Sequence, residues 1–313
     1  MIIFRKLIDK LFNQKINEIS QEVKDINHKL KYFDHLEQKL DTIISHLSDE
    51  NSFINMNIST IRHTSSVPFW EQEIRANKLI ESLKISKPVK LTRIGNSNDG
   101  GYFVPEEILI GVKVAVNIGI GTEVSLDEHL LKLGKNIHAF DPFLEKHPIS
   151  NTRIIFTQKG LGSNLVDKNT SLAEINNSLQ NFSKEEICLF IDIEGDEWDH
   201  FKNNVEIESL AKYGFLVIEF HNLLNKISKL DSEEFHLILK ILNKIKNNFE
   251  ISHINGNNSS ASLYFNGRTF PDVVEVTFVN KLIPLELIDI NKLSEYRSAN
   301  DKNRPPLNLN NWF

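Results

Sequence analysis

The stretch Val112-Lys113-Val114-Ala115-Val116-Asn117-Ile118-Gly119-Ile120-Gly121-Thr122-Glu123 decides the fold of this chain. Its first seven residues are rich in β-branched side chains and predict a buried parallel strand. The two glycines then allow a sharp turn in which the backbone comes close to a ligand. A helix is predicted from about Val124 to Leu133, with Gly134 as its stop. A second strand over residues 137–140 completes a strand–turn–helix–strand unit.

Asp141 follows the second strand, twenty residues after Gly121. An acidic side chain at this place can accept hydrogen bonds from both hydroxyls of a ribose, while the turn and the helix N-terminus face the rest of the ligand. Nicotinamide and flavin proteins carry a third glycine for a pyrophosphate, and Val124 stands in its place here. The unit therefore indicates a nucleoside-cofactor site. It favours S-adenosylmethionine, which has no phosphates, and leaves a dinucleotide as the alternative.

The bulk composition excludes some classes of function. A formal net charge of −6 argues against nucleic acid as the partner. The single cysteine, Cys188, lies in an apolar run and is expected in the core, which suits a reducing cytoplasm. No apolar segment approaches the length that spans a bilayer. We therefore expect a cytoplasmic protein, with contact at the inner face of the membrane as a further option.

Residues 1–61 contain neither Gly nor Pro and predict a long helix. Apolar residues follow one another at alternating spacings of three and four, as along a coiled-coil seam: Ile16, Ile19, Val23, Ile26, Leu30 and Phe33. Such a helix has to bury its apolar stripe, so we expect a homo-oligomer formed through it, or a helix lying on the domain. The first fifteen residues could instead rest on an anionic membrane surface or cap the bundle. Residues 62–89 are expected to form a linker and a helix.

Beyond residue 141, apolar runs that read as strands alternate with helical patterns. The runs cover residues 153–157, 187–194, 215–221, 251–254 and 273–279. This alternation predicts an α/β fold over residues 90–313, a Rossmann-like, seven-stranded, mostly parallel sheet with helices on both faces, preceded by the coiled coil. The last two runs have no helix between them, which is compatible with an antiparallel pair at one edge. That pattern distinguishes a methyltransferase sheet from a dinucleotide-binding sheet.

Polar residues end several of these strands. Ligands of open α/β sheets lie beyond the C-terminal ends of the strands, so these residues should converge: Asp141, Asp192, Glu194, Glu219, His221, His253 and Asn255. An acid inside a run as apolar as residues 189–193, as Asp192 is, is costly to bury without a partner. The polar residues at the strand ends could also be explained without a site, as helix caps, as exposed surface acids or as histidines buried in the core. A mixed imidazole–carboxylate set would also suit a divalent metal.

A second glycine turn precedes the central unit. Asp99-Gly100-Gly101-Tyr102 marks a turn, or a hairpin, that leads into an apolar run. A turn without function explains the glycines. It explains Asp99 and the nearby Arg93 less well, so a binding role is the alternative.

From Arg93 onward the chain resembles the FkbM-like S-adenosylmethionine-dependent methyltransferases, a class I, Rossmann-like family. The strongest piece is the D-x-E-G-x-E-W segment Asp192-Ile193-Glu194-Gly195-Asp196-Glu197-Trp198. Supporting pieces lie at residues 99–102, 217–221, 253–258 and 301–306. The chain departs from the pattern just before the glycine turn. Many methyltransferases have an acid there, whereas this chain has Ile118, with Asn117 next to it. The N-terminal helix lies outside the resemblance.

The resemblance implies O-methylation of a sugar hydroxyl in surface polysaccharide or glycoconjugate biosynthesis, with a carbohydrate or small molecule as acceptor. The expected catalytic residues are His221 as the base, because neutral imidazole is available near pH 7, with Asp192 and His253. A Mg²⁺ or Mn²⁺ ion would be held by Asp192, Glu194, His221 and His253. The expected cofactor-binding residues are Asp99, Gly100, Tyr102, Asn117, Gly119, Gly121, Asp141, Leu161 and Asp192. The alternatives are an NAD-dependent sugar oxidoreductase and a non-catalytic coiled-coil scaffold.

Overall fold

The computed structural model describes residues 67–162, 167–229, 231–265, 267–309 and 312. The chain divides into two units, residues 1–60 and 61–313, and the description below concerns the second. The predicted coiled coil and the first residues of the predicted linker, 1–66, lie outside the described residues, as does the oligomer expected from them.

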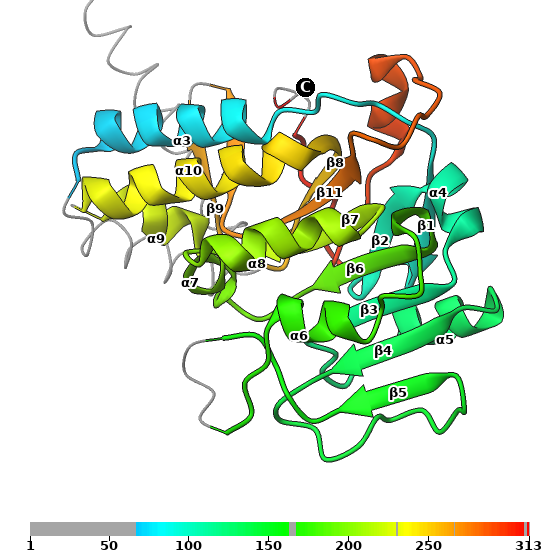
Figure 1. The fold of residues 1–313 in the computed structure, drawn as a ribbon. Helices are drawn as coiled ribbons and strands as arrows, with labels where there is room; N and C mark the ends of the chain where they lie inside the picture. Colours follow the sequence, from blue (N-terminus) through cyan, green and yellow to red (C-terminus); the bar gives the residue numbers. More distant parts are fainter. Residues whose placement is uncertain (1–66, 163–166, 230, 266, 310–311, 313) are drawn as a thin grey trace, which may run out of the picture. The chain divides into compact units, whose positions relative to one another are not determined.

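A seven-stranded sheet forms the centre of the described unit, with the strand order β5-β4-β3-β6-β7-β11-β8 (Figure 1). Its strands are β3 (Val114–Ile118), β4 (Asn136–Phe140), β5 (Ile154–Thr157), β6 (Ile187–Ile191), β7 (Phe215–Phe220), β8 (Phe249–Gly256) and β11 (Val274–Asn280). The pairs from β5 to β7 are parallel, whereas β11 runs antiparallel to both β7 and β8. The prediction of a mostly parallel sheet with an antiparallel pair near one edge is therefore confirmed.

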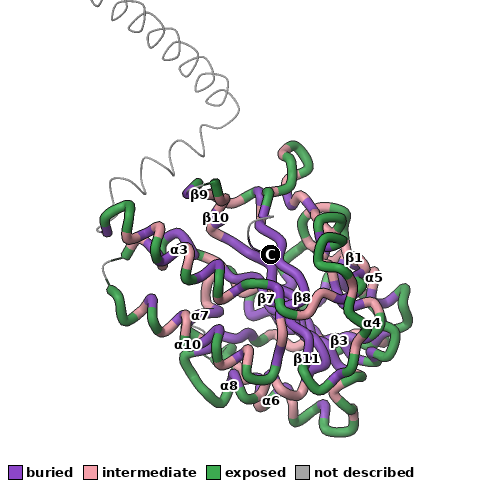
Figure 2. Tube along the Cα trace, turned by 90° about the horizontal axis from the view of Figure 1, so that it is seen from above, coloured by how far each residue is buried: buried purple, intermediate pink, exposed green. Residues whose placement is uncertain are grey.

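Helices cover both faces of the sheet, as predicted (Figures 1 and 2). One face carries α3 (Phe69–Leu83), α6 (Leu172–Asn177), α7 (Glu197–His200), α8 (Asn204–Ser209), α9 (Leu223–Ser228) and α10 (Ser232–Asn248). The other carries α4 (Glu106–Gly111) and α5 (Ser125–Lys132). Alternate residues of β3 serve the two cores, since Val116 packs on the first face and Ala115 on the second. Both faces of the strand are therefore apolar, which explains its continuous hydrophobic run.

Two hairpins and three short 3₁₀ helices complete the part of the unit that the structure describes. The hairpins are β1 (Leu91–Gly95) with β2 (Gly101–Pro105), and β9 (Ser262–Phe265) with β10 (Arg268–Pro271). The 3₁₀ helices are η1 (Lys184–Glu186), η2 (Leu210–Lys212) and η3 (Ile290–Glu295). The hairpin reading of the Asp99–Tyr102 turn is thus confirmed. The sequence did not predict β9, β10 or α4.

Some predicted boundaries move. The sequence of residues 172–182 reads as one helix, but α6 ends at Asn177, and the Ser178 hydroxyl donates to the Ile175 carbonyl at 2.7 Å directly after it. The sixth strand, predicted over 251–254, extends two residues further at each end. Within the described residues, no helix combines the length and the apolar character that crossing a membrane requires.

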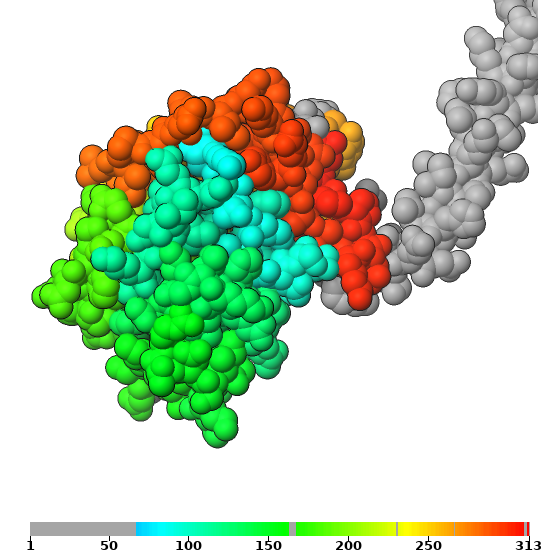
Figure 3. Space-filling model, turned by 90° about the vertical axis from the view of Figure 1, so that its right-hand side faces the viewer, coloured from blue at the N-terminus to red at the C-terminus, as the bar shows by residue number. Residues whose placement is uncertain are grey.

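The C-terminal part returns along the β1–β2 hairpin, and Figure 3 shows it in orange and red beside the cyan residues of the hairpin. The Ile288 N–H donates to the Pro88 carbonyl at 2.9 Å, and the Asn98 side chain donates to the Ala299 carbonyl at 2.9 Å. Asn258 holds the chain at Asp301 in place, because its side-chain amide donates to the Asp301 carbonyl at 3.1 Å. These contacts bring residues near 300 to the edge where the parallel strands end.

Candidate functional site

The glycine turn after β3 lies directly against the segment that follows β6. Gly119 has φ +82°, and a Cβ added there would lie 1.7 Å from the carbonyl oxygen of Asp192. Gly121 has φ +58°, but an added Cβ would meet nothing within 4 Å. Both conformations favour glycine. Only Gly119 is also required by packing, whereas Gly121 borders open space.

Asp141 ties this turn to the loop after β4. Its Oδ2 accepts from the N–H groups of Ile120 at 3.2 Å and Gly121 at 3.0 Å. Its Oδ1 accepts from Phe143 at 2.8 Å and Leu144 at 3.0 Å. A carboxylate has about four lone-pair sites, and backbone groups use all of them here. A ribose hydroxyl would therefore have to share an oxygen with one of these N–H groups, and the ribose role of Asp141 stays a prediction.

A cavity of about 390 Å³ opens beside the turn. It is lined by Asp99, Gly119, Ile120, Gly121, Thr122, Glu123, Asp141, Pro142, Phe143, Gly160, Leu161, Asp192, Ile193, Glu194 and Asp196. Six of the nine expected cofactor residues are in this set, namely Asp99, Gly119, Gly121, Asp141, Leu161 and Asp192. The structure thus brings the glycine turn, the acid after β4 and the acids after β6 to one place.

Asn117 is not among the lining residues. Its side-chain amide donates to Asp127 Oδ1 at 2.8 Å, and Asp127 Oδ2 lies 2.7 Å from His147 Nε2. These groups are buried and join β3 to α5. The expectation that Asn117 holds the cofactor is therefore corrected: its partner is a buried aspartate of the following helix.

Gly100 and Tyr102 also lie outside the lining set. A Cβ at Gly100 would lie 1.8 Å from Glu123 Oε2, so this glycine lets the hairpin turn approach the loop before α5. The Tyr102 ring packs on Phe190 with 5.8 Å between centroids. Burial, together with the charges of Glu219 and other nearby acids, raises the pKa of Tyr102 well above its ordinary value. Its phenol therefore belongs to the surroundings of the acidic group described next.

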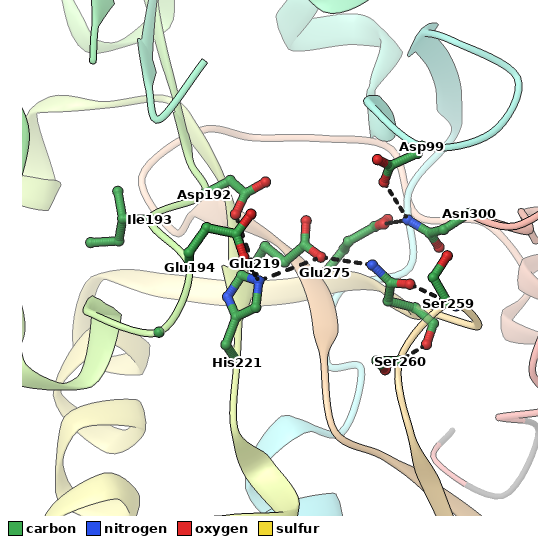
Figure 4. A network of polar contacts seen from close by, with 12 residues as sticks. Asp99, Asp192, Ile193, Glu194, Glu219, His221, Ser259, Ser260, Glu275 and Asn300 are labelled. Carbon is green, nitrogen blue, oxygen red and sulfur yellow. Dashed lines mark hydrogen bonds and ion pairs between the residues drawn. The ribbon is translucent and has the colours of Figure 1, made fainter. Parts of the chain in front are cut away.

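His221 lies at the end of β7 and is surrounded by carboxylates (Figure 4). Its Nδ1 is 3.1 Å from Glu197 Oε1. Its Nε2 is 3.5 Å from Glu194 Oε2, 3.7 Å from Asp192 Oδ1 and 4.0 Å from Glu219 Oε1. The latter distances are longer than hydrogen bonds. The imidazole is thus anchored on one side, and its other nitrogen faces three acids.

The D-x-E-G-x-E-W segment builds this arrangement locally. Glu197 folds back so that its Oε1 accepts from the N–H groups of Ile193 at 3.2 Å and Gly195 at 3.1 Å. Gly195 takes φ +110°, and Glu194 takes φ +56°, which is uncommon for a residue with a side chain. The Trp198 indole donates to the His221 carbonyl at 2.8 Å. The tight turn is therefore fastened to β7 and holds Asp192 and Glu194 beside the imidazole.

The crowding of acids shifts pKa values. Burial raises the pKa of Asp192 to about 7; His221 opposes this shift, and the charges of Glu194, Glu197 and Asp99 add to it. Burial alone would lower the pKa of His221, but the hydrogen bond to Glu197 and the charges of neighbouring acids outweigh it and raise this pKa to about 9. The imidazole therefore carries a proton near pH 7. The reason for expecting His221 to act as a base, a neutral ring at that pH, does not hold in these surroundings.

The predicted catalytic and metal-binding role of His253 is corrected as well. It lies in the middle of β8, three residues before the strand ends at Gly256, and its side chain is buried. Its Nε2 faces the Tyr296 carbonyl at 2.8 Å, and its ring packs on Phe103. Burial lowers its pKa to about 4. It is a core histidine and does not join the group around His221.

Glu275 and Asn300 were missed by sequence reasoning. Because β11 is antiparallel, its first residues lie where the other strands end, and Glu275 sits opposite Glu219 of β7. Asn300 donates to Glu275 Oε1 at 2.6 Å and to Asp99 Oδ1 at 3.3 Å (Figure 4). Burial raises the pKa of Glu275 to about 7. The antiparallel last strand was the signal that could have found Glu275, whereas Asn300 had no signal of its own, because the tail of the resemblance begins at Asp301.

No family model matches the chain, and no curated protein does. Among solved structures, a variant of 16S rRNA (adenine(1408)-N(1))-methyltransferase from Catenulisporales acidiphilia shares 7% identity, with 63% of this chain and 100% of that chain covered. A chain of a fibrillarin/Nop5p complex shares 12%, with 63% and 98% covered. A putative hemolysin from Streptococcus thermophilus shares 10%, with 61% and 72% covered. Each has a TM-score of 0.31, which is too low to support an inference.

The glycine turn gives a prediction with an internal control. Gly119→Ala places a methyl group against the Asp192 carbonyl and should lower the free energy of unfolding by about 2–4 kcal/mol. Gly121→Ala incurs only the strain of its positive φ and should cost about 1–2 kcal/mol. Urea denaturation of both variants measures the difference. Equal losses would show that the close approach of the two segments is wrong.

The lowered pKa of the buried His253 leads us to predict a pH dependence of the free energy of unfolding. Its pKa is about 4 in the fold and 6.5 ordinarily, so between these values the unfolded chain binds a proton that the folded chain does not. Its contribution is therefore intact above pH 6.5 and is lost as the pH falls toward 4, by at most about 3 kcal/mol. In His253→Gln the free energy of unfolding should fall less steeply over this range. Parallel curves for the two proteins would contradict a buried neutral histidine.

Proposed function

We propose that this protein is an S-adenosylmethionine-dependent O-methyltransferase that acts on a sugar hydroxyl. The observation that carries the proposal is that the glycine turn, Asp141 and the acids after β6 all line one cavity of about 390 Å³. Its volume lies within the range of about 300–1,000 Å³ that is usual for small-molecule sites. It is also at the C-terminal edge of the parallel strands, where open α/β sheets bind ligands.

The charge of the cavity supports this cofactor over a dinucleotide. Six acids line it, Asp99, Glu123, Asp141, Asp192, Glu194 and Asp196, and none of the described lining residues is Lys, Arg or His. A pyrophosphate would be repelled here, whereas a sulfonium and an ammonium group would be attracted. Val124 in place of a third glycine agrees with this preference.

Phe143 offers a surface for the adenine ring. It lies two residues after Asp141, lines the cavity, and is 82% exposed, which is unusual for a side chain of its size. Stacking of a base on an aromatic ring contributes about 1–3 kcal/mol. With the ribose near Asp141 and the glycine turn, the sulfonium end would extend toward Asp192 and Glu194.

The reaction itself is an in-line displacement. A lone pair of the acceptor oxygen forms the new bond to the methyl carbon while the carbon–sulfur bond breaks, and its electrons stay on sulfur to give S-adenosylhomocysteine. The hydroxyl proton passes to a carboxylate that faces the cavity, Asp192 or Glu194. Positioning supplies much of the rate in such a step.

The acceptor side is rich in groups that recognise hydroxyls. The buried carboxylates of Glu219 and Glu275 lie next to His221 and bond to the amide side chains of Asn257 and Asn300, and we propose that the acceptor approaches from this side. An anionic acceptor would be repelled by this set. The sugar and its place in polysaccharide or glycoconjugate biosynthesis rest on the resemblance to the FkbM-like enzymes.

Calorimetric titration with S-adenosylmethionine, S-adenosylhomocysteine and NAD tests the proposal. The two adenosyl ligands should bind and NAD should not, and Phe143→Ala should weaken binding by about tenfold or more. The control is Phe69→Ala, which removes another exposed phenylalanine, on α3, and should leave the affinity unchanged. Binding of NAD alone, or equal affinities of the wild type and Phe143→Ala, would overturn the proposed cofactor site.

A further inference from the structure

Asp192, Glu197 and His221 come together in the geometry of a cation site. Each offers one ligand atom, and these atoms all lie within 4.8 Å of one another. An ion bound at about 2.0–2.2 Å from each ligand holds its ligands no more than about 4.4 Å apart. Small side-chain movements would therefore close the three groups around an ion.

Two buried oxygens of this group lack hydrogen bonds. Asp192 Oδ1 and Glu197 Oε2 are both inaccessible to solvent and have no hydrogen-bond partner among the described residues. The Glu197 side chain is 0% exposed, while its other oxygen is fully used by Ile193, Gly195 and His221. A buried carboxylate oxygen without a partner costs free energy. A cation between the three residues would satisfy both oxygens at once.

The imidazole is oriented for the same purpose. Because Nδ1 faces Glu197, the ring is fixed with Nε2 toward Asp192 and Glu194. Glu197 lies on the Nδ1 side of the ring, with its Oε1 3.1 Å from Nδ1, so an ion shared by the three residues would replace the hydrogen bond between them.

We propose that Asp192, Glu197 and His221 bind one divalent cation, of which Mn²⁺ is the best match to two carboxylates and an imidazole. Binding releases to solvent the proton that the imidazole carries in the absence of the ion. This set differs from the one expected from the sequence, because Glu197 replaces His253. Glu194, whose side chain is 86% exposed and lies on the cavity side, is left outside the three ligands.

The role of the ion, unlike its binding, rests on the proposed methyl transfer. Three protein ligands leave coordination positions for the acceptor hydroxyl and water. Coordination lowers the pKa of a hydroxyl and orients its oxygen. Glu194 would then accept the proton while Asp192 stays bound to the ion.

The test is titration of the full chain, freed of metal with EDTA, with MnCl₂ alone, followed by calorimetry and by the loss of the free Mn²⁺ electron paramagnetic resonance signal. The wild type should bind one ion per chain saturably. Asp192→Asn and Glu197→Gln should each weaken binding by about tenfold or more. Glu197→Gln keeps an oxygen for the N–H groups of Ile193 and Gly195, and circular dichroism checks that both variants fold.

The matched control is Asp199→Asn. It removes one negative charge from the same helix as Glu197, but Asp199 is exposed and paired with Lys202, so the affinity should not change. Absence of saturable Mn²⁺ binding by the wild type, or equal weakening in all three variants, would overturn the site. Binding of S-adenosylmethionine is measured separately in EDTA. Mn²⁺ binding without cofactor binding would refute the methyltransferase proposal and leave the cation site standing.

Discussion

The approach of Gly119 to the carbonyl of Asp192 is the contact on which the rest of the candidate site depends. It requires a residue without a side chain after β3, because any Cβ would collide with that backbone oxygen. Backbone hydrogen bonds hold the same neighbours together, since the Asp192 N–H donates to the Ile118 carbonyl at 3.0 Å and the Gly119 N–H to the Phe140 carbonyl at 2.9 Å. The ends of β4, β3 and β6 are thereby locked side by side, and one cavity can serve all three.

The concentration of acids at this edge is costly, and the surrounding structure shows how the cost is reduced. Glu197 accepts two backbone N–H groups and faces an imidazole; Glu275 accepts from two side-chain amides; Glu219 accepts from Asn257. The raised pKa values of Asp192 and Glu275 express the cost that remains. Such shifts gather at functional sites more often than elsewhere. A bound cation would remove much of the repulsion, which is the electrostatic reason why the cation and methyl-transfer proposals fit one site.

Much of the fold could be predicted from local patterns. The unit from β3 to β4, the Asp99 hairpin and the buried Cys188 follow from β-branched runs, turn residues and apolar surroundings, all of which act over a few residues. The candidate site was harder. Asn117 was misread because its partner, Asp127, lies ten residues away in the next helix, and His253 because the strand continued through polar residues to Gly256. Glu275 could be placed in the site only by knowing the direction of β11, and Asn300 only by knowing the path of the C-terminal segment. Local sequence does not encode either of these.

The central claim is that a cofactor in the cavity points its reactive sulfur at the acids around His221. A crystal structure of the chain with S-adenosylhomocysteine measures this directly. The account predicts adenine on Phe143, ribose beside Asp141 and Gly121, and the sulfur on the side of Asp192 and Glu194. A ligand bound elsewhere, or one whose sulfur faces away from Asp192, would contradict it.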